Sequence, residues 1–135
     1  MGYFTSSYIR EKIEKTNLFK HVKVKRESDA INVLAEILVC RKEVSYRTPT
    51  GELVIDLLCG DIPIEVEYKK RPFEGFQQAI AYIVLAGFKK SMVIHIFPFY
   101  DKYFVKAFCN IVFFLRNIGI DGLIIVSDTG EVVEC

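Results

Sequence analysis

Apolar residues recur along this chain at two different spacings, which divide it into helical and extended segments. Spacings of three and four residues predict helices over residues 6–16, 28–39, 73–86 and 101–119. Residues that can cap a first turn stand at three of these starts: Ser6 or Ser7, Ser28 or Asp29, and Asp101. We therefore expect each of these three helices to begin with a side-chain cap.

Alternating or continuous apolar runs predict strands over residues 21–25, 43–47, 53–59, 62–69, 92–97 and 123–126. Pro49-Thr50-Gly51 turns the chain between the second and the third of them. From residue 28 onward, the order is helix, three strands, helix, strand. This order predicts an α/β fold with a central sheet flanked by helices.

The two strands around Gly60-Asp61 carry the most informative pattern in the chain. Asp56 interrupts the apolar run 53–59, and the next strand alternates apolar residues with Glu65, Glu67 and Lys69. Gly60-Asp61 is typical of a two-residue type II′ hairpin turn, because glycine supplies the positive φ. In a hairpin with an even loop, Asp56 then lies on the same face as Glu65, Glu67 and Lys69.

Carboxylates brought together in this way repel each other. Opposed residues in a sheet have Cβ atoms about 4.5–5.5 Å apart, and burial strengthens the repulsion unless a cation lies between the acids. The hairpin therefore predicts a site for a divalent metal. A strand with a solvated polar face would account equally well for Glu65, Glu67 and Lys69, but not for Asp56 inside an apolar run.

The same residues give the chain a resemblance to a known enzyme superfamily. Asp56 followed by Glu67-Tyr68-Lys69 resembles the signature of the PD-(D/E)XK nucleases, and Gln78-Ala79-Ile80-Ala81-Tyr82 is similar to the Gln-x-x-x-Tyr helix motif of their RecB-like and phage-exonuclease branches. The resemblance covers about residues 29–97. The superfamily name refers to a proline before the first acid. Ile55 stands at that position here, and many members also lack the proline. The resemblance implies a restriction-endonuclease-like αβββαβ core around a mixed sheet.

The resemblance also implies a reaction, the hydrolysis of DNA phosphodiester bonds with Mg²⁺ or Mn²⁺ as cofactor. Asp56 and Glu67 would bind the metal, together with the backbone carbonyl of Tyr68, and Lys69 would orient a water or stabilise the transition state. Oxygen ligands without Cys or His favour these two metals over Zn²⁺.

Four further residues are candidates for supporting roles. Gln78 and Tyr82, one turn apart on a helix, would brace Lys69 or contact a phosphate, unless they are simply the polar edge of that helix. Glu36 matches a helical glutamate that completes the metal site in many relatives, although a solvent-facing Glu explains it too. Glu65 is an alternative ligand or a ligand for a second metal.

Nucleic acid binding would have to come from local groups, because the net charge is only +1. Lys70 and Arg71 adjoin the expected metal site and are the first candidates for contacts to the DNA backbone. Lys23 and Lys25 alternate with valines, so they form a cationic strip if residues 21–25 are a strand. No module that reads base sequence is visible.

Length and composition fit one small domain, residues 1–135, with a core over about 28–127 and an N-terminal helical extension over 1–27. We expect a cytoplasmic protein, since there is neither a signal peptide nor an apolar run long enough to span a membrane. The cysteines show no metal-binding spacing, which favours free buried thiols, with disulfides mainly in a hyperthermophile: Cys40, Cys59, Cys109 and Cys135.

The helix over residues 102–117 is apolar over more than one stripe, including Phe113 and Phe114. The excess indicates a second buried surface, either a homodimer interface or a layer under the N-terminal segment. Three functions stay open. The first is a DNA nuclease, including a dimeric Holliday-junction resolvase of the archaeal type. The others are a catalytically silent nucleic-acid-binding module and a protein-interaction module.

Overall fold

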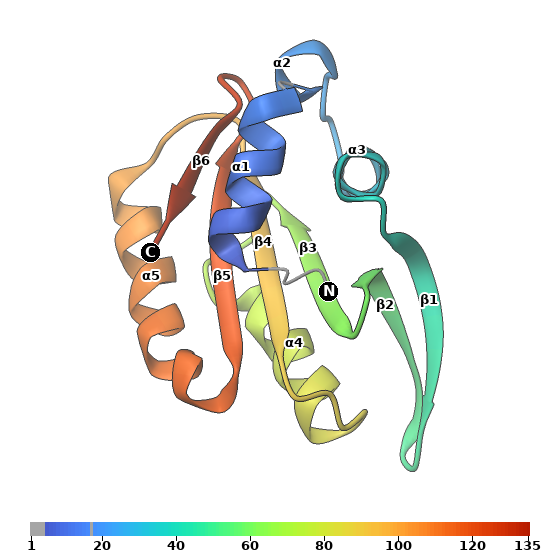
Figure 1. Cartoon of the computed structure of the whole chain (residues 1–135). Helices are drawn as coiled ribbons and strands as arrows, with labels where there is room; N and C mark the ends of the chain where they lie inside the picture. The colour runs from blue at the N-terminus through green and yellow to red at the C-terminus, as the bar shows by residue number, and fades with distance from the viewer. Residues whose placement is uncertain (1–4, 17) are drawn as a thin grey trace.

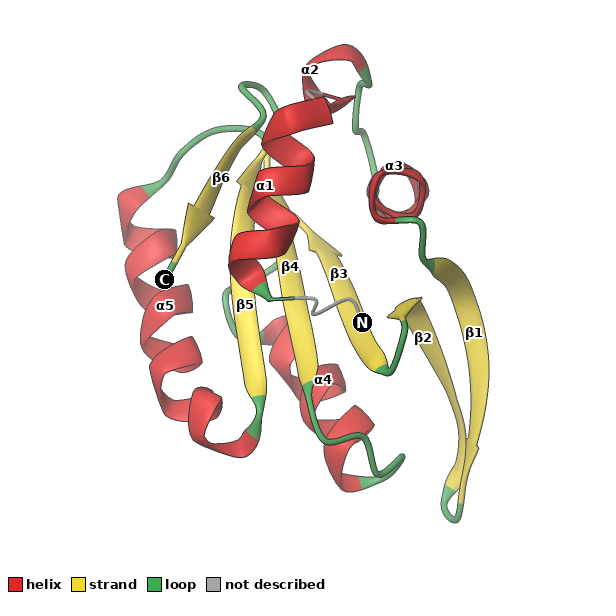
Figure 2. Ribbon diagram, viewed as in Figure 1, coloured by secondary structure: helices red, strands yellow, loops and turns green. Residues whose placement is uncertain are grey.

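A computed structural model describes residues 5–16 and 18–135 as a six-stranded mixed sheet with helices on both faces (Figures 1 and 2). The strands lie in chain order across the sheet: β1 (Arg41–Thr48), β2 (Gly51–Cys59), β3 (Ile62–Tyr68), β4 (Ser91–Phe97), β5 (Ile120–Val126) and β6 (Glu131–Glu134). The helices are α1 (Ser6–Thr16), α2 (Leu18–His21), α3 (Glu27–Leu38), α4 (Glu74–Val84) and α5 (Lys102–Leu115), with a 3₁₀ turn η1 (Arg116–Ile118). The predicted α/β fold with a mixed central sheet is confirmed.

The direction of each strand follows from the length of its connection. β1, β2 and β3 form an antiparallel meander because tight turns join them. The pairs β3–β4 and β4–β5 are parallel, and α4 and α5 respectively provide the crossovers that parallel neighbours require. β6, which the sequence did not predict, adds an antiparallel edge next to β5.

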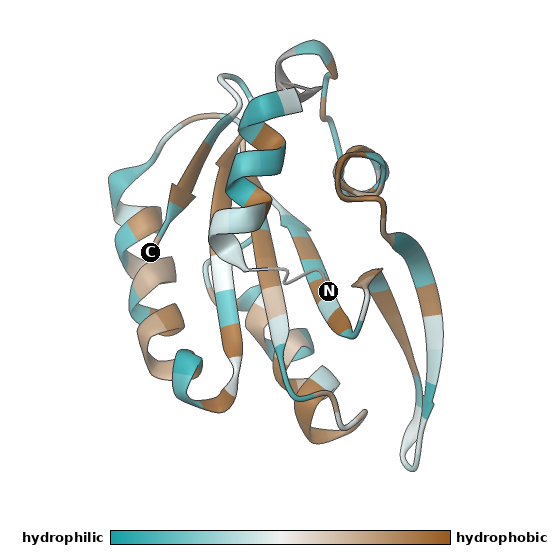
Figure 3. Cartoon of the chain, viewed as in Figure 1, coloured by the Kyte–Doolittle hydropathy of each residue, from teal (hydrophilic) through white to brown (hydrophobic). Residues whose placement is uncertain are grey.

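Two apolar layers hold the helices to the sheet. On one face, α1 and α3 pack on Ile64, Ile94 and Ile96, all fully buried. On the other face, α4 and α5 pack on Val93 and its neighbours. Figure 3 shows hydrophobic residues along nearly the whole of β4 and much of β5, which are covered on both sides.

Close packing explains a glycine in β5. A Cβ at Gly122 would lie 2.9 Å from the ring of Phe108 and 3.0 Å from Val112. Because these are buried side chains of α5, any larger residue would push that helix away from the sheet.

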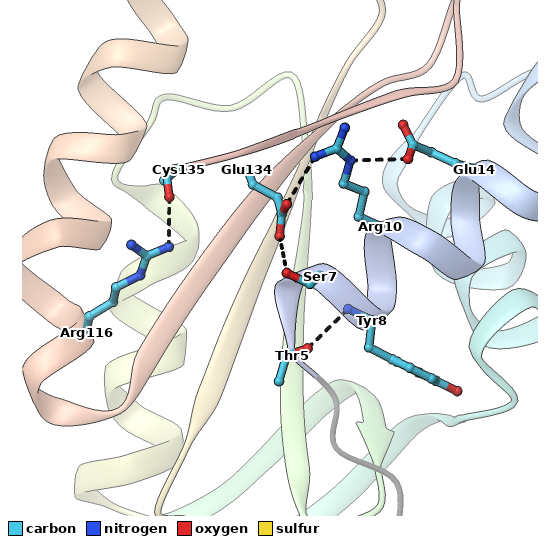
Figure 4. A network of polar contacts seen from close by, with 8 residues as sticks. All are labelled: Thr5, Ser7, Tyr8, Arg10, Glu14, Arg116, Glu134 and Cys135. Carbon is cyan, nitrogen blue, oxygen red and sulfur yellow. Dashed lines mark hydrogen bonds and ion pairs between the residues drawn. The ribbon is translucent and has the colours of Figure 1, made fainter.

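The N-terminal helix is tied to the end of the chain. Glu134 accepts hydrogen bonds from Ser7 (3.0 Å) and Arg10 (3.2 Å), as Figure 4 shows. Ile9 and Ile13 of the same helix are buried in the layer shared with α3. The segment expected to be an extension therefore contributes its first helix to the core.

Three local predictions were wrong. Residues 21–25 are not a strand, because they pair with no neighbouring strand in the described part of the chain. The Val24 carbonyl instead accepts a hydrogen bond from the Tyr68 hydroxyl (3.2 Å). Thr5, not Ser6 or Ser7, accepts the capping bond from the Tyr8 amide (3.1 Å). α3 begins at Glu27, and Asp29 accepts from the Lys25 amide rather than capping the first turn (3.1 Å). The cap at Asp101 is confirmed.

The cysteines are paired, so the expectation of free thiols is wrong. Cys40 is bonded to Cys59 and Cys109 to Cys135, with Cα–Cα distances of 4.8 and 5.1 Å. The strand register explains the first pair, because the Arg41–Leu58 pair places the residues just beyond it side by side. None of the helices in the described part of the chain has the length and apolar character needed to cross a membrane.

Candidate functional site

The β2–β3 hairpin forms as the sequence predicts. Cys59 pairs with Ile62 across Gly60-Asp61, and pairing continues only as far as Leu57 and Ile64. Gly60 has a φ of 64° while Asp61 keeps a negative φ, which fits the type II′ turn. The loop holds two residues, so the predicted even register is confirmed.

Beyond the Leu57–Ile64 pair the two strands separate, and Asp56 lies at the point of separation. Its carboxylate accepts a hydrogen bond from the Val66 amide (2.9 Å), in place of a backbone partner. The ladder to β1 is also interrupted here, since Glu43 has a φ of 53° and does not pair with Asp56. Asp56 is therefore partly buried at a gap in the sheet, with its charge held by an amide.

Two acids of β3 face the same gap. Glu65 and Glu67 are only 9% and 8% exposed, which rules out the solvated polar face considered from the sequence. Their side chains pack beside α4, where a Cβ at Gly75 would come within 2.9 Å of Glu67 Cγ. Glycine at this helix position therefore leaves room for the two carboxylates.

Four carboxyl groups form a chain across this gap. Glu65 is within hydrogen-bonding reach of Asp56 and of Glu67, and Glu67 is within reach of Glu27 at the first residue of α3. Glu65 also accepts a hydrogen bond from the buried hydroxyl of Tyr82 (2.8 Å). We call Glu27, Asp56, Glu65 and Glu67 the carboxylate chain.

Glu27 was not among the residues selected from the sequence. Glu36 was proposed as the glutamate from this helix, but it is exposed, and α3 brings Glu27 to Glu67 instead. The signal in the sequence was weak, because an acid in the first turn of a helix is common for electrostatic reasons alone.

Burial raises the pKa of three of these acids, Glu27, Asp56 and Glu65. Burial, followed by the charge of Asp56, raises the pKa of Glu65 to about 10. Burial, followed by repulsion from Glu67, raises the pKa of Glu27 to about 7. Burial also raises the pKa of Asp56, although the Val66 amide opposes the shift. Near neutral pH the carboxylate chain therefore retains protons unless a cation replaces them.

The carboxylate chain suits a hard divalent cation by its chemistry. All its donors are carboxylate oxygens, which Mg²⁺ and Mn²⁺ prefer. Across residues 5–16 and 18–135, however, no three His, Cys, Asp or Glu side chains surround one point. The four acids are arranged in a line and bonded to their neighbours, so binding an ion would require side-chain rotation.

Lys69 does not continue the alternation of β3. The strand ends at Tyr68, and Lys69 has a φ of 56°, so its side chain does not follow Glu67 on the same face. Its ammonium lies 5.6 Å from the centre of the Tyr68 ring. Lys70 is instead the cation whose charge acts on Glu27. The expected alignment of Lys69 with the acids is therefore wrong in this arrangement.

The loop carrying these lysines is held by β4. The Lys69 amide donates to the Ile96 carbonyl (3.1 Å), and the Lys70 amide donates to Nε2 of His95 (3.2 Å). His95 is fully buried, and burial lowers its pKa to about 4, so its neutral ring can accept this bond. His95 was not among the residues selected from the sequence, yet it positions the loop beside the acids.

The remaining candidates occupy different places. Tyr82 is fully buried and holds Glu65, so it contacts neither Lys69 nor a phosphate. Gln78 is half-buried on α4, and within the described residues no hydrogen bond links it to the carboxylate chain. Arg71 is exposed and pairs with Glu74 (3.4 Å). A role for the Tyr68 carbonyl stays a prediction.

No protein-family model, curated protein or solved structure matches this chain. The arrangement of the carboxylate chain therefore has to be interpreted from these residues alone. The resemblance to PD-(D/E)XK nucleases stays a prediction based on Asp56, Glu67-Tyr68-Lys69 and the Gln78–Tyr82 spacing.

Proposed function

We propose that this protein is a metal-dependent nuclease of the PD-(D/E)XK type that hydrolyses DNA phosphodiester bonds with Mg²⁺ or Mn²⁺. One observation carries the proposal: Glu27, Asp56, Glu65 and Glu67 come from three elements and meet where β2 and β3 separate. Bringing two buried and two half-buried acids together is unfavourable for a fold alone. Perturbed, mutually interacting carboxylates are typical of sites that bind cations or transfer protons.

In the proposed mechanism, Asp56 and Glu67 would hold the metal, with Glu27 or Glu65 as a further ligand. The metal would lower the pKa of a bound water and neutralise charge on the scissile phosphate. Tyr82 orients Glu65 through its hydroxyl, and His95 holds the Lys70 amide. Lys69 would leave the Tyr68 ring and turn toward the phosphate, which its four-carbon side chain permits.

A homodimer is the second part of the proposal. Phe113 and Phe114 of α5 are 63% and 81% exposed, and Tyr103 on the same helix is 75% exposed. These rings do not belong to the protein's own core, so an exposed aromatic surface is left over. A dimer of this kind would present two sites to one substrate, as a Holliday-junction resolvase requires. Phe114→Glu should then give folded monomers in light scattering.

A catalytically silent nucleic-acid-binding module is the alternative. Such a module would need neither this cluster of buried and half-buried carboxylates nor their interactions, which favours the nuclease. The paired cysteines are typical of oxidising compartments and of intracellular proteins from hyperthermophiles. A cytoplasmic location therefore stays a prediction.

One assay tests the proposal directly. The purified protein is incubated with linear, circular, branched and single-stranded DNA and with RNA, in Mg²⁺, in Mn²⁺ and in excess EDTA. We expect cleavage of DNA with either metal and none in EDTA. Cleavage that continues in EDTA, or in Glu67→Gln, would come from another site or a contaminant and would contradict the proposal.

A further inference from the structure

A second site lies across β3 from the carboxylate chain. A cavity of about 540 Å³ opens where the parallel strands β3, β4 and β5 end, between Tyr68, Pro98 and Ser127. Its other wall is α2 and the extended segment 22–25, seen at the upper edge of the sheet in Figure 1. Open α/β sheets bind ligands outside the carboxyl ends of their strands, and this volume is typical of a small-ligand pocket.

The rim of the cavity is cationic. Lys23, Lys25 and Lys69 line it and are exposed, whereas Asp128 is its one acidic lining residue. Among the described residues, no ion pair engages any of these three lysines. Their charges are therefore available to an anion from solution.

The wall beneath this rim carries both polar and apolar groups and is held in place. Val22, Val24 and Tyr68 line the cavity together with Phe19. The Tyr68 hydroxyl donates to the Val24 carbonyl (3.2 Å), which ties segment 22–25 to the end of β3. The cavity thus offers the half-buried Val22 side chain and the half-buried Tyr68 ring as apolar contacts below a set of cations. A nucleotide has the matching parts, a flat base and a charged phosphate.

Two short stretches of chain connect the cavity to the carboxylate chain. Lys25 is two residues from Glu27, and Lys69 is two residues from Glu67. Two residues span at most about 7 Å. Tyr68 and Glu67 nevertheless point to opposite faces of β3, since they are consecutive strand residues. Only a flexible strand that bends around the end of β3 could occupy both.

We infer that the cavity binds an unpaired nucleotide of the substrate, with its phosphate on Lys23 and Lys25 and its base against the apolar side chains below them. This inference rests on the proposed function and makes it more specific. The preferred substrate carries a single-stranded segment next to the bond that is cut, as an overhang, a flap or a branch does. A fully paired blunt duplex cannot supply such a nucleotide.

The test measures binding without cleavage. Fluorescence anisotropy in EDTA follows a labelled oligo-dT of about 12 nucleotides, within the site sizes of single-strand binders. Lys23→Ala/Lys25→Ala should weaken binding about tenfold or more and lower the salt slope by about 1.4, because each phosphate contact on a single strand contributes about 0.7. Lys69 is left unchanged because it belongs to the proposed catalytic machinery.

Lys89→Ala/Lys90→Ala is the matched control. It removes the same charge from exposed lysines that precede β4, at the opposite end of the parallel strands. This control should leave oligo-dT affinity within about twofold, as expected for surface substitutions. An equal loss in both double variants would reduce the effect to net charge and overturn the inference.

Two further probes identify the ligand. An abasic strand with the same phosphates should bind the wild-type protein about tenfold more weakly, because a stacked base contributes about 1–3 kcal/mol. Equal affinity for the two strands would overturn the assignment of a nucleotide. Blunt duplex should bind equally well to the wild type and to Lys23→Ala/Lys25→Ala, and a matching loss there would mean a duplex-backbone site instead.

Cleavage assays keep the two proposals distinguishable. If the protein cuts DNA but Lys23→Ala/Lys25→Ala leaves its single-strand affinity unchanged, the nuclease proposal stands and the cavity inference is wrong. If the protein binds oligo-dT through these lysines but cuts nothing in Mg²⁺ or Mn²⁺, the nuclease proposal is wrong and the cavity still binds nucleic acid.

Discussion

The two strand pairs β4–β5 and β2–β3 belong to one sheet but are built differently. β4 and β5 pair without interruption from Ser91–Ile120 to Phe97–Val126, and most of their side chains are apolar toward both faces. β2 and β3 pair only from Leu57–Ile64 to the turn and then separate around Asp56.

This difference separates the part of the sheet that stabilises the fold from the part that can carry chemistry. Complete pairing and largely apolar burial in β4–β5 leave few polar groups there, and His95 is fully buried with its Nε2 bonded to the Lys70 amide. The β2–β3 junction lacks backbone pairs and buries carboxylates, two features that are unfavourable for stability. Such local costs are typical of functional sites, where the surrounding structure maintains them.

The largest expected effect is on catalysis at the junction. Asp56→Asn or Glu67→Gln should abolish cleavage, since each removes a charge that the metal requires. Both variants should stay folded, because losing one acid relieves repulsion. Circular dichroism and a cleavage assay check this. Glu36→Gln, an exposed site on α3, is the control and should be fully active; normal activity in both junction variants would leave the carboxylate chain without a catalytic role.

The next effect separates two neighbouring lysines. Lys69→Ala should lower kcat by about two orders of magnitude, as expected for a group acting in the transition state. Lys70→Ala should mainly raise KM through lost contact with the DNA backbone. Steady-state kinetics measure both constants. Because Lys70 rather than Lys69 acts on Glu27 here, the opposite result would transfer the catalytic role to Lys70.

Stability measurements should show the same division of the sheet. Ile94→Ala in β4 should lower the free energy of unfolding by about 2–5 kcal/mol, the range for deleting a buried aliphatic side chain. Glu65→Gln at the junction should lower it by far less, or raise it, in metal-free protein near neutral pH. Urea unfolding in EDTA compares the two. A large loss in Glu65→Gln would show that its charge stabilises the fold.

The smallest effect is a pH dependence of stability. Folding raises the pKa of Glu27 to about 7 and that of Glu65 to about 10, so the folded protein binds more protons than the unfolded chain above their ordinary value of 4.5. The free energy of unfolding therefore falls as pH rises through this window. His95 acts in the opposite sense, but only below its ordinary value of 6.5.

We accordingly expect the Tm in EDTA to fall between pH values of about 7 and about 9, between the two raised pKa values. Mg²⁺ should raise the Tm most at the upper end, where it replaces protons that have left. Glu65→Gln should flatten the slope. A Tm that changes with neither pH nor Mg²⁺ would mean that these acids neither retain protons nor bind the ion.

Periodicity sufficed for the hairpin because the turn and the alternation of side chains are local. Gly60-Asp61 sets an even register, and that register brings Asp56 opposite Glu65 wherever the rest of the chain lies. The same holds for the start of α5, because the Asp101 cap involves only the amides two and three residues further along the chain.

What the sequence could not predict depends on how distant elements meet. Glu27 reaches Glu67 only because α3 packs against β3, and the Cys40–Cys59 pair depends on the register of β1 with β2. Lys69 has a positive φ, so its side chain does not continue the alternation of β3. A positive φ is uncommon for lysine, and nothing in the sequence indicates it. Residues 21–25 alternate like a strand, but no neighbouring strand is available to them.

The bond from the Val66 amide to Asp56 gives the site a spectroscopic reporter. An amide that donates to a carboxylate changes its chemical shift when that carboxylate gains a proton or binds a cation. Val66 is fully buried in β3. The surrounding structure therefore protects its amide proton from exchange with solvent. One resonance in an isotope-labelled sample would therefore follow the ionisation of Asp56 and the arrival of Mg²⁺, without substrate and without any substitution.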